Sequence, residues 1–154
     1  MINKIRWDKE LFLTAVDLTT HLILALLLAW FFWWLTRGWV WPLLAVVGGV
    51  FIDLDHFIDY FLYFGAKFDL RDFFTRGYKV SGKTYVFLHS WELVALMWLF
   101  SIAVLWITPL AAGMTVHLLT DYLFSSRSNA LVLSLVYRWY HKFESVKDHG
   151  INQF

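Results

Sequence analysis

Four apolar segments make up most of this 154-residue chain, and they favour a membrane-embedded helical fold. A helix needs about 20 mostly apolar residues to cross a bilayer. Segments 11–35, 39–64 and 85–107 meet that requirement, and 110–124 is a shorter fourth segment. Hydrophobic residues form 60% of the chain and charged residues only 16%, unlike a soluble domain. The sequence therefore predicts an all-α integral membrane four-helix bundle, formed as a single domain over residues 1–154.

A fifth segment, 129–143, is apolar but carries Arg138, His141 and Lys142 near its end. It is too short and too basic at that end to cross a bilayer. An amphipathic segment of this kind lies in the membrane surface. We therefore predict a C-terminal interfacial helix.

The distribution of Lys and Arg predicts the orientation. With four spans, the N-terminus, the connection 65–84 and the C-terminus share one side, which carries 12 of the 13 basic residues. Only Arg37 lies on the other side. Cytoplasmic loops of membrane proteins carry the excess of Lys and Arg. We therefore expect both termini in the cytoplasm and a multi-pass location in the cell (inner) membrane. The net charge of +1 gives no reason to expect a nucleic-acid partner.

The stretch 48–59 places four ionisable residues, Asp53, Asp55, His56 and Asp59, in apolar surroundings. An ionised carboxylate in such surroundings is costly unless it is paired or binds a metal. The chain contains no Cys, so a metal would have to be bound by His and carboxylate side chains. Such ligands favour Zn, with Mn, Fe and Mg as alternatives.

The predicted topology brings ionisable residues of all four spans to the cytoplasmic half. Several are spaced by three or four residues, such as His117 and Asp121, and therefore share a helix face. Gly49 and Gly113 would let the helices approach closely there. We predict a site for one or two divalent ions with the ligands His21, Asp53, Asp55, His56, His89, His117 and Asp121. Ser90, Glu92 and Asp59 are the residues predicted to assist catalysis, and Asp17 or Asp59 would orient an imidazole.

A plainer interpretation exists for each residue taken alone. A single His in a membrane helix is more often a hydrogen-bonding contact than a ligand, and Asp55 and Asp59 could pair with Arg71 or Arg76. Convergence of so many ionisable groups at one depth favours a functional site instead.

The order His…Asp-x-Asp-His…His-Ser…His-x-x-x-Asp resembles the membrane-bound metal-dependent hydrolases of the YdjM type. Its pieces here are His21, Asp53 to His56, His89-Ser90 and His117 to Asp121. The chain departs from that pattern at Ile52, where the family usually has Pro, and at Phe87-Leu88, where it often has His-Arg followed by Thr. The resemblance implies a metal-dependent hydrolase without naming its reaction.

These observations predict hydrolysis of a lipid ester or phosphoester at the cytoplasmic face. A membrane lipid is the expected partner, because the connection before the third span is basic and suits an anionic headgroup. Its basic residues are Lys67, Arg71, Arg76, Lys79 and Lys83. The alternative is a metal-ion or proton conduit, which ranks second because the ionisable groups occupy only one half of the spans. The sequence is compatible with a homodimer but does not require one.

Overall fold

The computed structural model describes residues 2–70, 73, 82–124 and 130–144. Regular structure in these residues is helical, and their only β-type pairing is an isolated bridge between Lys83 and Glu144. The prediction of an all-α fold is therefore confirmed for the described part of the chain.

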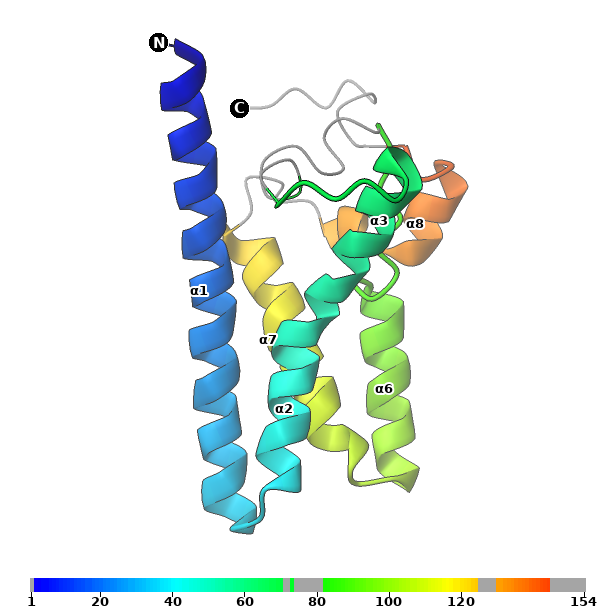
Figure 1. The fold of residues 1–154 in the computed structure, drawn as a ribbon. Helices are drawn as coiled ribbons and strands as arrows, with labels where there is room; N and C mark the ends of the chain where they lie inside the picture. The colour runs from blue at the N-terminus through cyan, green and yellow to red at the C-terminus, as the bar shows by residue number, and fades with distance from the viewer. Residues whose placement is uncertain (1, 71–72, 74–81, 125–129, 145–154) are drawn as a thin grey trace.

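The helices run up and down beside one another, with the N-terminus and the connection before α6 at the same end (Figure 1). Helix α2 packs against both α1 and α7, and α6 packs against α7. The elements are α1 (Ile2–Thr36), α2 (Val40–Val50), the 3₁₀ turn η1 (Phe51–Leu54), α3 (Asp55–Phe64), α6 (Trp91–Ala103), α7 (Ile107–Phe124), the 3₁₀ turn η2 (Ala130–Leu133) and α8 (Leu135–Tyr140).

Several boundaries differ from the ranges expected from hydropathy. Helix α6 ends at Ala103 rather than at 107, and α7 begins at Ile107 rather than at 110. The helix of the third segment begins at Trp91, because Ser90 is extended and its Oγ accepts a hydrogen bond from the Leu93 amide. The second segment is interrupted by η1, so it is not one continuous helix. The C-terminal segment contains η2 followed by α8, which Ser134 caps in the same way.

Glycines allow α2 and α7 to touch backbone to backbone. A β-carbon at Gly48 would overlap the Leu110 carbonyl, and one at Gly113 would lie 2.8 Å from the Gly49 amide nitrogen. A β-carbon at Gly49 would come within 2.8 Å of the Ala25 β-carbon on α1. The expectation that Gly49 and Gly113 permit close helix approach is confirmed.

Many small and polar residues of the helices are buried, and many large apolar residues are exposed. Ala25, Ala45 and Ala111 are buried, whereas Leu27 and Trp30 are more than half exposed. Two helical stretches, Leu11–Thr36 (26 residues) and Val40–Phe64 (25 residues), are long and apolar enough to cross a membrane. Helix α6 is apolar but has 13 residues.

Candidate metal centre

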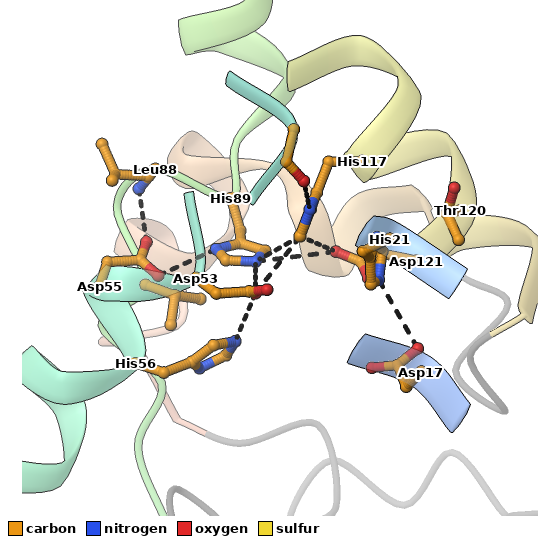
Figure 2. Close-up of polar contacts among 12 residues, drawn as sticks. Asp17, His21, Asp53, Asp55, His56, Leu88, His89, His117, Thr120 and Asp121 are labelled. Atoms are coloured by element: carbon orange, nitrogen blue, oxygen red, sulfur yellow. Dashed lines mark hydrogen bonds and ion pairs between the residues drawn. The ribbon is translucent and has the colours of Figure 1, made fainter. Parts of the chain in front are cut away.

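Ionisable side chains from four parts of the chain meet where α2 gives way to α3 (Figure 2). All seven residues predicted as metal ligands belong to this group. They are His21 of α1, Asp53 of η1, Asp55 and His56 of α3, His89 of the connection before α6, and His117 and Asp121 of α7. The contacts within the group show that the topology of the helices, rather than sequence proximity, assembles it.

Asp53 lies at the centre of the group. Its Oδ1 is 3.2 Å from Nε2 of His89, 3.3 Å from Nε2 of His117 and 3.8 Å from Nε2 of His56. The two nitrogens of His89 and His117 are themselves 3.2 Å apart. Three ring nitrogens therefore surround one carboxylate oxygen.

The contacts of the other ring nitrogen, Nδ1, determine the tautomers of His117 and His89. His117 Nδ1 is 2.9 Å from the Gly49 carbonyl oxygen, which can only accept, so this nitrogen carries the proton. His89 Nδ1 is 3.0 Å from Oδ1 of Asp55, and a carboxylate likewise calls for a donor. In neutral rings the two Nε2 atoms then present lone pairs to each other and to Asp53. Acceptor atoms this close repel one another, so a cation is required between them, either a metal ion or an added proton.

The spacing fits a metal ion. Ligand atoms about 2.0–2.1 Å from a tetrahedral Zn²⁺ lie about 3.3 Å from one another. The separations among Asp53 Oδ1, His89 Nε2 and His117 Nε2 are 3.2 to 3.3 Å. Oδ2 of Asp121 is 3.5 Å from His117 Nε2 and 3.8 Å from His89 Nε2. These residues could therefore hold a divalent ion with little rearrangement.

Burial differs within the group. The side chains of His89 and His117 are 4% and 0% exposed, whereas those of Asp53 and His56 are 27% and 32% exposed. Asp53 and His56 therefore lie nearer the surface than the two buried imidazoles.

His21 lies at the other end of the group. Its ring stacks on that of His117, with centroids 3.9 Å apart and planes inclined by 21°. Its Nε2 lies 3.1 Å from Oδ1 of Asp121 and 3.6 Å from Oδ1 of Asp17. Asp17, which we expected to orient an imidazole, is thus near His21 but is 56% exposed.

Asp55 occupies a different position from the one the sequence predicted. Its Oδ1 faces Nδ1 of His89, and its Oδ2 accepts a hydrogen bond of 2.7 Å from the Leu88 amide. The carboxylate therefore lies behind the imidazole, on the side away from Asp53, rather than beside Nε2 of His89 and His117. In this position it is suited to orient the His89 ring.

Arg138 of α8 contacts the connection that carries His89, and it is not among the residues predicted for the site. Its guanidinium donates to the carbonyl oxygens of Val86 and His89, and the residue is 4% exposed. Burial lowers the pKa of Arg138, and the nearby carboxylates of Asp55, Glu92 and Asp59 oppose that shift. The only signal in the sequence was a charged residue in an otherwise apolar helix.

The three residues predicted to assist catalysis all accept hydrogen bonds from backbone amides. Ser90 Oγ caps α6, and the Glu92 carboxylate accepts from Ser134 Oγ and from the amides of Leu135 and Val136 at the start of α8. Asp59 Oδ1 accepts a hydrogen bond of 2.6 Å from the Tyr85 amide. These contacts favour structural roles for Ser90, Glu92 and Asp59 over the catalytic roles expected from the sequence.

Comparisons with known proteins add no assignment to this geometry. No family model, curated protein or solved structure matches the chain. The site therefore has to be interpreted from its own residues.

Proposed function

We propose that this chain is a membrane-embedded, metal-dependent hydrolase that acts on a lipid ester or phosphoester at the cytoplasmic face. One observation carries the proposal: His89 Nε2, His117 Nε2 and Asp53 Oδ1 converge within 3.2 to 3.3 Å, with the opposite nitrogens of both rings facing acceptors. The resemblance of the His and Asp pattern to YdjM-type hydrolases supports the same class.

The surface of the helices supports insertion as a four-helix bundle in a membrane. The core helix of a soluble protein is mostly buried. In contrast, only 11% of the most apolar part of Leu11–Thr36 is buried, and only 28% of the most apolar part of Val40–Phe64. Large apolar side chains therefore face outward, as they do when lipid is the solvent. The close approach at Gly48 and Gly113 is the small-residue packing common in membrane helices.

Zn²⁺ is the ion that the ligand set favours. Imidazole nitrogen and carboxylate oxygen at tetrahedral spacing suit zinc, whereas Mn²⁺, Fe²⁺ and Mg²⁺ prefer more oxygen ligands or six-fold geometry. A bound divalent ion would supply a Lewis acid and lower the pKa of a coordinated water. The chain's own groups hold the ion on the buried side, and Asp53 and His56 lie nearer the surface.

The surroundings of Asp53 suit a lipid. Phe51 and Leu54 lie in η1 with Asp53 and are each about half exposed. Exposed apolar side chains on the turn that carries Asp53 would contact acyl chains while the polar group of the lipid reaches the ion. Lys67 and Lys83 lie in the described part of the basic connection, whereas Arg71, Arg76 and Lys79 lie outside the described residues.

A conduit for metal ions or protons is the alternative, and the packing of the opposite end argues against it. Ala29, Phe32 and Ala45 are buried there against Leu28, Trp41, Val46 and Ala112. Segments 22–36, 40–50 and 94–116 contain no Asp, Glu, His, Lys or Arg. A conduit needs polar groups through the whole depth of the membrane, so hydrolysis at one face is the better explanation.

The test is metal analysis of the purified full-length protein beside His117→Ala, with His141→Ala as the matched control because His141 ends α8 outside the group. We expect bound Zn²⁺ in the unmodified chain and in His141→Ala, and a loss of at least tenfold in His117→Ala. Vesicles containing anionic phospholipids or isoprenoid phosphates then test turnover. Equal metal in all three proteins, or none, would exclude the metal centre. Bound metal without hydrolysis of any substrate would exclude the hydrolase alone.

A further inference from the structure

The two carboxylate oxygens of Asp121 face two different imidazoles. Oδ1 lies 3.1 Å from Nε2 of His21, and Oδ2 lies 3.5 Å from Nε2 of His117 (Figure 2). A carboxylate that binds a single ion directs one or both oxygens at one point. Here each oxygen is instead directed toward its own ring nitrogen, which is the arrangement of a bridging ligand.

The stacking of His21 on His117 separates the points at which these nitrogens are aimed. A ring nitrogen binds an ion in the plane of its ring, and the two planes are inclined by only 21° with centroids 3.9 Å apart. Nearly parallel rings cannot direct both lone pairs at one ion. Their lone pairs lie in two nearly parallel planes rather than in one. Two-metal sites have their ions about 3.5–4 Å apart.

The buried ring of His21 contacts carboxylates at one nitrogen only. The residue is 3% exposed, and neither ring nitrogen forms a hydrogen bond in the described part of the chain. A buried imidazole is normally hydrogen-bonded. Two carboxylates approach its Nε2, those of Asp121 and Asp17, at 3.1 and 3.6 Å. The nitrogen and the two oxygens could bind a second cation.

We propose that the centre holds two divalent ions bridged by Asp121. The first lies among Asp53, His89, His117 and Oδ2 of Asp121, and the second lies among His21, Asp17 and Oδ1 of Asp121. This inference rests on the proposed metal-dependent hydrolase and narrows its substrate to a phosphoester. Two ions at this spacing can bind both the attacking and the leaving oxygen of a phosphoryl group during in-line displacement.

The first test is the number of ions per chain in the full-length protein after loading with Zn²⁺. We expect two in the unmodified chain and in His141→Ala, and one in His21→Ala, because that substitution leaves Asp53, His89 and His117 in place. If the unmodified chain binds one ion and His21→Ala retains it, the two-ion centre is overturned but the proposed hydrolase still stands. No ion in the unmodified chain would overturn both.

The second test needs no substitution, so it stands even where His21→Ala fails to fold. The unmodified protein is loaded with Mn²⁺ and examined by electron paramagnetic resonance. Two ions bridged by one carboxylate are expected to give an exchange-coupled spectrum. A six-line spectrum of isolated ions at full loading would overturn the bridge. Vesicles containing a phosphate monoester lipid or a carboxylic ester lipid test the substrate class, and hydrolysis of the carboxylic ester alone would overturn the phosphoester assignment.

Discussion

The Asp55 carboxylate lies directly behind His89, with Oδ1 3.0 Å from Nδ1 of the ring whose Nε2 faces Asp53. Both Asp55 Oδ1 and His89 Nδ1 are buried and have no other polar partner in the described part of the chain. A carboxylate in this position fixes the tautomer of the imidazole and makes Nε2 a better ligand. The pair therefore connects the start of α3 to the loop that carries His89.

Replacing Asp55 tests this positioning role. Asp55→Asn keeps the size of the side chain but removes the charge that fixes the His89 tautomer, so we expect metal affinity to fall by about 10–100-fold. Competition with a chelator measures the change. The control is Asp69→Asn, because Asp69 lies in the loop after α3 and contacts Tyr60 through its backbone. If Asp55→Asn abolishes binding even at saturating metal, Asp55 is a direct ligand instead.

Removing the buried guanidinium of Arg138 is expected to destabilise the fold as well as the site. Arg138→Gln leaves the carbonyl oxygens of Val86 and His89 without their donor. An unsatisfied buried polar group costs about 1–3 kcal/mol, so we expect a loss of about that size in the free energy of unfolding. Thermal unfolding in detergent, together with metal affinity, measures both effects.

The control for Arg138 is the exposed Arg37, which lies over the Trp33 ring at the opposite end of the molecule. Arg37→Gln removes a contact worth about 0.5–1 kcal/mol and leaves the metal centre untouched. Equal unfolding temperatures and equal metal affinities for the two variants would contradict the assigned role of Arg138.

The crossing of α2 and α7 is predicted to be intolerant of a single methyl group. Gly48→Ala would place a β-carbon on the Leu110 carbonyl and push α7 away from α2, at a cost of about 1–3 kcal/mol. Metal affinity should fall too, because His117 Nδ1 bonds to the carbonyl of the adjacent Gly49. Gly38→Ala is the control, since its nearest neighbours lie at 3.9 Å. Thermal unfolding that is unchanged in Gly48→Ala would show that the helices do not approach this closely.

Labelling with an impermeant thiol reagent tests the orientation in the membrane. The chain has no Cys, so Arg37→Cys and Lys67→Cys each introduce a single reactive thiol. Intact cells should label Arg37→Cys, whereas Lys67→Cys should react only after the membrane is opened, because basic loops stay in the cytoplasm. If intact cells label Lys67→Cys but not Arg37→Cys, the orientation is the reverse of the one predicted. If intact cells label both variants, residues 40–64 do not cross the membrane.

The apolar helical segments and the members of the ionisable group could be predicted from the sequence. Hydropathy is a local property, and the lengths of the apolar segments follow from it directly. The group could be predicted because His21, Asp53, His89 and His117 are costly in apolar surroundings unless they meet one another. The break at η1 was not predictable in this way, because Phe51–Leu54 contains neither Gly nor Pro.

The partner of each polar atom followed only from the packing of the helices. Glu92 and Asp55 are both carboxylates near the site in sequence, yet one caps α8 and the other orients His89. Arg138 is far from the group in the chain but is buried against it. A buried polar group takes whichever partner packing brings within hydrogen-bond distance, and packing depends on how helices far apart in sequence meet. Hydropathy and spacing could therefore identify which residues gather, but only their packing separates ligands from the residues that position them.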